Sequence, residues 1–120
     1  DTLKVNGTDI KVFINRYDYL SIESGGIPDE FALHENYPNP FNPTTQIRFD
    51  LPEMSNVNLT IYNMLGQRVK AFNMESAPAG YHALTWNATN DLGSPVSAGV
   101  YLYQLQTKEF VKTKKMVLLK

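Results

Sequence analysis

The chain has 120 residues, 42% of them hydrophobic and 19% charged, which is ordinary for a globular protein with one core of modest size. Its longest apolar runs fall far short of the roughly 20 residues that cross a bilayer as a helix, so we predict no transmembrane segment. The absence of cysteine excludes disulfides, thiolate metal sites and cysteine nucleophiles, although it leaves an extracellular location open.

The charge is distributed unevenly along the chain. Residues 1–35 carry seven acidic and three basic side chains, a net charge of −4, whereas residues 36–120 carry five and eight, a net charge of +3. This asymmetry reflects either chance or attraction between the two parts of neighbouring copies. We expect an N-terminal β arm, or the end of an upstream domain, at 1–35 and a β-sandwich at 36–120. Because the chain begins at Asp1 without a methionine and shows no signal-like segment, we expect a processed product or an excised piece.

The predicted arm alternates apolar and polar residues in two short stretches around the turn-forming residues Asn6 to Asp9. This pattern predicts two strands and a further apolar segment before a hinge at Gly25-Gly26 and Pro28. An isolated hairpin is marginal in water, so the arm needs a partner surface. An upstream domain, its own sandwich or another copy's sandwich would each provide one. The apolar residues of this assembly arm are Leu3, Val5, Ile10, Val12, Ile14, Tyr17, Tyr19, Leu20 and Ile22.

Three prolines and three asparagines fall within the segment from Glu35 to Thr45. Proline offers no backbone donor and favours an extended conformation in the residue before it, so this segment is neither a helix nor a central strand. We predict a stiff lead-in that holds the arm away from its own sandwich and lets it reach a neighbour. The linker motif comprises Tyr37, Pro38, Asn39, Pro40, Phe41, Asn42 and Pro43.

From residue 46 onward, short alternating segments are separated by turn-forming residues, and no window sustains a helical period. Residues 46–51 and 57–61 are close enough in sequence to predict an antiparallel hairpin. Residues 74–79 and 87–95 are predicted loops, whereas 100–105 is apolar on both faces, as a central strand would be. The remaining predicted strands are 68–72, 80–86 and 110–119. The pattern predicts an all-β, immunoglobulin-like antiparallel β-sandwich of about seven strands with an extended N-terminal β arm.

Trp86 is predicted to occupy the centre of the core, because the single tryptophan contributes more buried area than any other side chain. His82 and Leu84 share its strand face, so His82 is predicted to be a partly buried strand residue. The complete predicted core is Ile47, Phe49, Leu51, Val57, Leu59, Ile61, Leu84, Trp86, Tyr101 and Tyr103.

Several segments occur in an order that one family shares. They are Tyr37 to Pro43, Ile61 to Val69, Ala79 to Trp86, Ser97 to Tyr101 and Lys115 to Lys120. Together they resemble the C-terminal sorting domain of type IX secretion over residues 36–120, and they are similar to the immunoglobulin-like domain of the flagellar hook-capping protein. The resemblance implies a non-enzymatic module at the end of a secreted cargo. Such a module directs the cargo across the outer membrane and is then cleaved or retained as a surface anchor.

The resemblance further implies an extracellular or outer-surface location in a bacterium, with the outer-membrane secretion machinery or a surface-anchoring apparatus as partner. The last strand would be the recognised element, read through its backbone at a sheet edge with its lysines facing an acidic receptor. A second interpretation is that Met116 and Leu118 fill the core while the lysines guard the edge against aggregation. The sorting strand comprises Lys112, Lys114, Lys115, Met116, Val117, Leu118, Leu119 and Lys120.

Catalytic and metal-binding chemistry finds little support in the sequence. His34 and His82 form no metal-ligand spacing, and the oxygen-bearing residues Asn87, Asn90 and Asp91 lack a calcium-loop pattern and are explained by turn formation. We therefore predict no enzyme activity, no cofactor and no metal site. We also predict no nucleic-acid partner, because the basic cluster near the C-terminus is small and the pI is about 6.1.

The alternative function belongs to another class. If the arm adds strands to a neighbour's sheet, the chain is a structural subunit of an extracellular filament or surface polymer that assembles head to tail. The partners would then be other copies of the chain.

Overall fold

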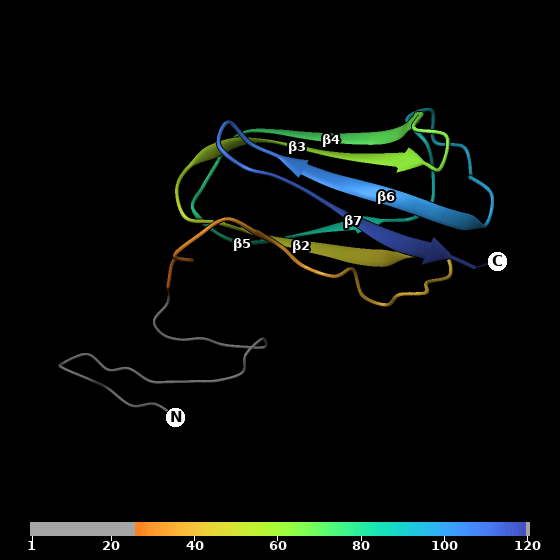
Figure 1. Ribbon diagram of the computed structural model, residues 1–120, viewed down its shortest axis with the longest axis horizontal. Helices are drawn as coiled ribbons and strands as arrows, with labels where there is room; N and C mark the ends of the chain where they lie inside the picture. Colours follow the sequence, from red (N-terminus) through yellow and green to blue (C-terminus); the bar gives the residue numbers. More distant parts are fainter. Residues whose placement is uncertain (1–25, 120) are drawn as a thin grey trace, which may run out of the picture.

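The computed structural model describes residues 26–119 as a sandwich of two antiparallel sheets (Figure 1). One sheet has the order β1-β2-β5 and the other the order β4-β3-β6-β7. This architecture confirms the predicted all-β antiparallel sandwich. The predicted assembly arm from Leu3 to Ile22 and Lys120 of the sorting strand lie outside the described residues. The strands are β1 (Ala32–Leu33), β2 (Thr45–Leu51), β3 (Ser55–Asn63), β4 (Arg68–Ala77), β5 (Gly80–Trp86), β6 (Gly99–Gln106) and β7 (Val111–Leu118).

The core lies between the two sheets, because alternate residues of each strand point inward. Trp86 is 1% exposed, and its ring packs against those of Phe41 and Tyr101 at centroid distances of 5.8 and 5.5 Å. Leu84 is partly buried against the core. The other predicted core residues are all buried, namely Ile47, Phe49, Leu51, Val57, Leu59, Ile61, Tyr101 and Tyr103.

The predicted hairpin between residues 46–51 and 57–61 is wrong. β2 pairs with β1 and β5, whereas β3 pairs with β4 and β6, so the chain crosses from one sheet to the other after Leu51. The reason is that alternation specifies which face of a strand is buried and leaves its neighbour undetermined. Both sheets of a sandwich bury the same kind of alternating face, so sequence proximity alone misassigned the pairing.

β4 is longer than predicted and includes part of the expected loop at 74–79. It continues to Ala77, with Met74 opposite Val57 and packed against the core. A register shift in β3 between Ser55 and Val57 accompanies this extension. Ser76 has a φ of 54° there, and its N–H donates to Asn56 Oδ1 over 2.8 Å. A polar strand end with a bulge has the composition of a loop, which explains the error.

The linker motif at 37–43 packs against the sandwich, whereas the arm that it was predicted to hold away lies outside the described residues. Phe41 is 2% exposed and contacts the Trp86 ring, and Asn36 before the motif is 3% exposed. The prolines lack backbone donors, but the Pro38 carbonyl accepts from Thr45 Oγ1 of β2. Tyr37 bonds to β2, and Asn39 and Phe41 bond to residues of β7. In addition, β1 pairs with β2, so the three-stranded sheet begins before residue 36.

Candidate interaction site at the terminal strand

β7 is an edge strand of the four-stranded sheet and pairs along its length with β6 (Figure 1). Met116 and Leu118 point into the core, with 0% and 1% of their surface exposed. Lys112 and Lys115 are exposed, and Lys114 is partly buried. Val117 is also partly buried, and Leu119, just past the strand, is 50% exposed. The strand therefore combines a core-filling end with a basic end.

The segment Asn39-Pro40-Phe41, which we call the clasp, covers the outer edge of the core-filling end. Phe41 N donates to Val117 O over 3.0 Å, and Leu119 N donates to Phe41 O over 2.8 Å. The Asn39 side chain adds a third contact, because its Oδ1 accepts from Val117 N over 3.0 Å. Phe41 and Leu118 form a parallel bridge. The clasp thus completes the backbone pairing of residues 117–119.

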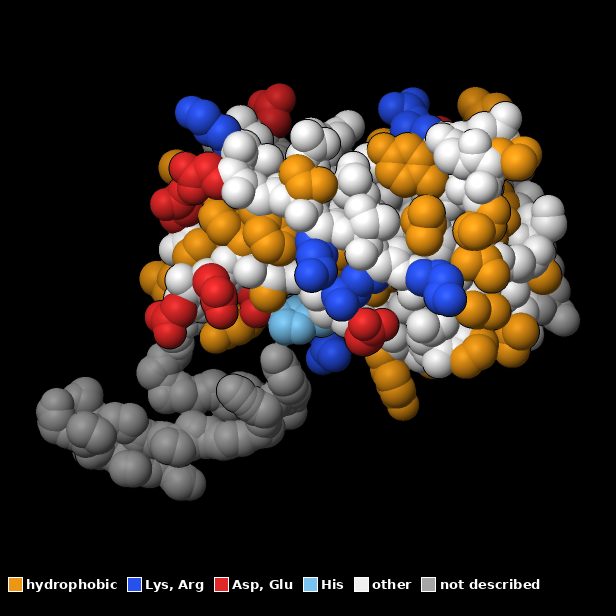
Figure 2. Space-filling view, in the orientation of Figure 1, with side chains coloured by type: hydrophobic (Ala, Val, Ile, Leu, Met, Phe, Trp, Pro, Cys, Tyr) orange, Lys and Arg blue, Asp and Glu red, His pale blue; other side chains and the backbone are white. Residues whose placement is uncertain are grey.

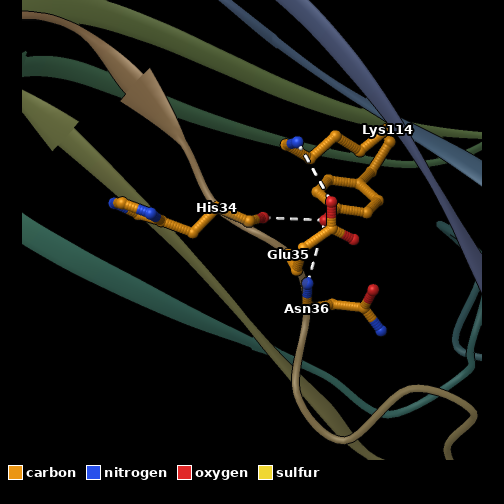
Figure 3. Close-up of polar contacts among 5 residues, drawn as sticks. His34, Glu35, Asn36 and Lys114 are labelled. Carbon is orange, nitrogen blue, oxygen red and sulfur yellow. Dashed lines mark hydrogen bonds and ion pairs between the residues drawn. The ribbon is translucent and has the colours of Figure 1, made fainter. Parts of the chain in front are cut away.

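A buried phenol connects the segment before the clasp to the centre of the sheet (Figure 3). Tyr103 Oη accepts from Asn36 N over 2.9 Å and donates to His34 O over 2.8 Å. Burial raises the pKa of Tyr103 to about 12; the Glu35 carboxylate adds to this effect and the Asn36 hydrogen bond opposes it. The phenol therefore stays neutral and acts as both donor and acceptor.

Three further contacts hold the same segment in place. Lys114 Nζ lies 3.1 Å from Glu35 Oε2, and the two side chains point toward each other in Figure 3. Asn36 Nδ2 donates to Thr45 Oγ1 over 3.0 Å, which ties the segment to β2. Tyr37 pairs with Gln46 through two backbone hydrogen bonds of 3.0 and 2.8 Å. The Asn/Pro-rich segment is thus bonded to both sheets.

Sequence reasoning found the residues of the sorting strand but missed the contact between them and the linker motif. The available signal was Phe41, an aromatic side chain within a proline-rich segment, since such a ring is usually buried. It also missed the pairing of Glu35 with Lys114, which are 79 residues apart in sequence. Tyr103 was predicted as a core residue, without its polar role.

Lys and Arg side chains gather near the middle of the molecular face shown in Figure 2, most acidic side chains lie toward one end, and one acidic side chain lies beside the basic group. On β7, Lys112 and Lys115 are exposed, whereas Lys114 is paired with Glu35. This edge of the sandwich therefore offers cations to a partner.

The two histidines and the polar residues of the 87–95 loop make contacts with neighbouring residues of the fold. His34 Nε2 lies 2.9 Å from Asp50 Oδ2, and the His82 ring stacks on Phe49 at a centroid distance of 5.2 Å. Asn90 Oδ1 accepts from Leu92 N and Ser94 N within the loop. Over residues 26–119, no three acidic or histidine side chains come close enough together to hold a metal ion. Nor does that part of the chain contain a helix with the length and apolarity of a membrane span.

Solved structures with the same fold include two from Porphyromonas gingivalis. Dimeric latent PorU is 20% identical to this chain with a TM-score of 0.58, and the match covers 84% of this chain and 10% of the PorU chain. PorZ, described as an essential bacterial surface component of the type-IX secretion system, is 18% identical with a TM-score of 0.53. That match covers 73% of this chain and 11% of the PorZ chain. The chain thus spans about a tenth of each.

FlgD from P. aeruginosa is 27% identical with a TM-score of 0.50, and the match covers 62% of this chain and 57% of that one. No curated protein matches the chain. Residues 35–119 match the family model of the secretion system C-terminal sorting domain, and this range includes the clasp and all of β7. The chain belongs to the family of secretion system C-terminal sorting domains.

Proposed function

We propose that the chain is a non-enzymatic domain that sorts an attached protein through type IX secretion and anchors it at the outer surface of a bacterium, with β7 as the recognised element. Its partners are the outer-membrane secretion machinery or the surface-anchoring apparatus. The observation that carries the proposal is the position of β7, which forms a sheet edge at the C-terminal end of the family match.

The physical basis is that an edge strand presents backbone groups to a second polypeptide, while its side chains provide specificity. Lys112 and Lys115 project from this strand into solvent and suit an acidic receptor surface. Met116 and Leu118 hold the strand in the core, so recognition and folding use different residues of the same strand. The two interpretations of the lysine-rich end are therefore compatible.

Comparing two positions of the same chain tests this function. In a bacterium with type IX secretion, the full chain is fused to the C-terminus of a reporter that is delivered to the periplasm. We expect the reporter at the cell surface. A matched fusion carries the reporter after Lys120 instead, which blocks the end of the domain and leaves its sequence unchanged, and we expect it to stay in the periplasm. A C-terminal fusion that folds and stays in the periplasm would contradict the proposal.

The head-to-tail polymer depends on the arm at Leu3 to Ile22, which lies outside the described residues, and it stays a prediction.

A further inference from the structure

The outer edge of β7 is divided into a closed part and an open part. Val117 N and O both bond to the clasp, so they point away from β6. In an antiparallel strand alternate residues point their backbone groups to the same side, and the pairing of β7 with β6 runs without a register shift. Val111, Thr113 and Lys115 therefore also point their N–H and C=O groups outward.

These three residues have no backbone partner on that side among residues 26–119. The open edge thus extends from Val111 to Lys115 and ends where the clasp begins. An unpaired edge of this kind is a template for an added strand. The clasp occupies the template from Val117 to Leu119, so an added strand must stop before it.

Two other edges show why charge, and not exposure alone, distinguishes this site. In β2, the backbone groups of Gln46 and Arg48 bond to residues 34–37. The backbone groups of Ile47 and Phe49 therefore point to the other side, toward β5, where they lie opposite Leu84 and His82. The alternate residues of β5, including Ala83, therefore point their backbone N–H and C=O groups away from β2, toward the outer edge. However, β5 contains no Lys, Arg, Asp or Glu. β4 is covered near Val69 and Ala71 by Asp91.

The cations beside the open edge of β7 lie on both faces of the strand. Lys112 and Lys115 differ by an odd number of positions, so their side chains project to opposite faces, and both are exposed. Lys114 is paired with Glu35. A strand added here would pass between two exposed cations.

We propose that the open edge Val111–Lys115 binds an extended acidic segment of the export machinery by strand addition, with Lys112 and Lys115 pairing with its carboxylates and the clasp fixing where the pairing ends. The proposal rests on the proposed sorting function and names the partner of its site. The segment pairs with five residues of β7, from Val111 to Lys115, which at about 3.3 Å per residue makes it a short strand.

The test uses the full chain fused to the C-terminus of the reporter described above. Thr113→Pro removes one outward N–H and leaves the backbone bonds to β6 intact, because proline is tolerated where the strand N–H faces solvent. It also removes Thr113 Oγ1, which accepts from Gln104 Nε2 of β6 over 3.1 Å in an exposed contact. We expect the amount of reporter at the cell surface to fall by about tenfold or more, because the added strand loses one backbone hydrogen bond and the proline ring disturbs the pairing there. The double variant Lys112→Gln and Lys115→Gln should reduce it by about threefold or more.

Matched controls change the other edges. Ala83→Pro places the same substitution at an outward position of β5, and Arg68→Gln with Lys70→Gln removes two cations from β4. Both should leave export unchanged. Thermal unfolding of each purified variant checks folding, and Val111→Pro, at the first residue of β7, replaces Thr113→Pro if that variant fails to fold. Normal export of a folded proline variant of β7, or equal loss in the Ala83→Pro control, would overturn the proposal.

Two further outcomes separate this proposal from its alternatives. If the unmodified fusion itself is not exported, the sorting function fails. If it is exported and the lysine variants are also exported normally, the acidic partner is wrong while the sorting function stands. A concentration-dependent dimer of the purified chain that Thr113→Pro abolishes would identify a second copy as the occupant and would likewise overturn the proposal.

Discussion

The two edge strands of the four-stranded sheet, β4 and β7, are both covered near one end, but by different means. On β4, Asp91 N donates to Val69 O over 2.9 Å, and Asp91 Oδ1 accepts from Ala71 N over 3.1 Å. The Asp91 side chain is 38% exposed. On β7 the covering residue Phe41 is 2% exposed and packs on Trp86.

The difference teaches that covering an edge stabilises the fold only as much as the covering residue is anchored. An exposed carboxylate exchanges its contacts for water at little cost. A buried aromatic ring couples its segment to the core, so the clasp should open only when the core itself is disrupted.

Phe41→Ala should have the largest effect. It removes a buried ring from the core and detaches the clasp from β7, so we expect a loss of about 3 to 5 kcal/mol in the free energy of unfolding. Urea denaturation measures this loss. A change below about 1 kcal/mol would show that Phe41 is not anchored in the core.

Tyr103→Phe should rank second. It leaves Asn36 N and His34 O without their buried partner, at a cost of about 1 to 3 kcal/mol. Because the folded pKa of Tyr103, about 12, lies above the ordinary value of 10.0, its neutral form stabilises the fold fully below pH 10. That contribution disappears as the pH rises from 10 to 12.

Stability measured across this alkaline range gives a second readout for Tyr103→Phe. The variant should lose less stability between pH 10 and 12 than the unchanged chain, although burial also raises the pKa of Tyr101 and leaves it some dependence. Equal alkaline losses in the two proteins would contradict the buried neutral phenol.

Asn39→Ala tests the clasp without disturbing the core. It removes the acceptor for Val117 N, and water replaces it because the contact is exposed. We expect a loss of about 0.5 to 1 kcal/mol by urea denaturation. A loss as large as that of Phe41→Ala would show that the side-chain amide, not the ring, anchors the clasp.

Asp91→Asn should have the smallest effect. It removes the charge that pairs with Arg68 at 3.2 Å, where the two side chains are 63% and 38% exposed, and it keeps an acceptor for Ala71 N. The free energy of unfolding should change by no more than about 0.5 kcal/mol. An effect larger than that of Asn39→Ala would reverse the contrast between the two edges.

The sequence predicted the fold class and the inward faces well, because alternation reports burial directly. Ile47, Phe49 and Leu51 illustrate this, since all three are fully buried. Strand neighbours were harder, as the transfer of the chain between sheets after Leu51 shows. No local pattern distinguishes pairing within a sheet from packing across a sandwich.

The clasp was the main feature that sequence reasoning missed. Proline content correctly argued against a helix or a central strand, but it gave no sign that residues 39–41 bond to the terminal strand. The contacts between Phe41 and residues 117–119 join distant parts of the chain. Such contacts depend on where the fold brings the two segments, which neither segment specifies alone.

Amide hydrogen exchange along β7, followed by NMR, tests the central claim most directly. The amides of Thr113, Lys115, Val117 and Leu119 all lie on the outer edge, and the clasp pairs with only the last two. Protection of Val117 and Leu119, together with fast exchange at Thr113 and Lys115, is the predicted result. Uniform protection along the edge, or fast exchange at all four amides, would contradict the division of β7 into a closed and an open part.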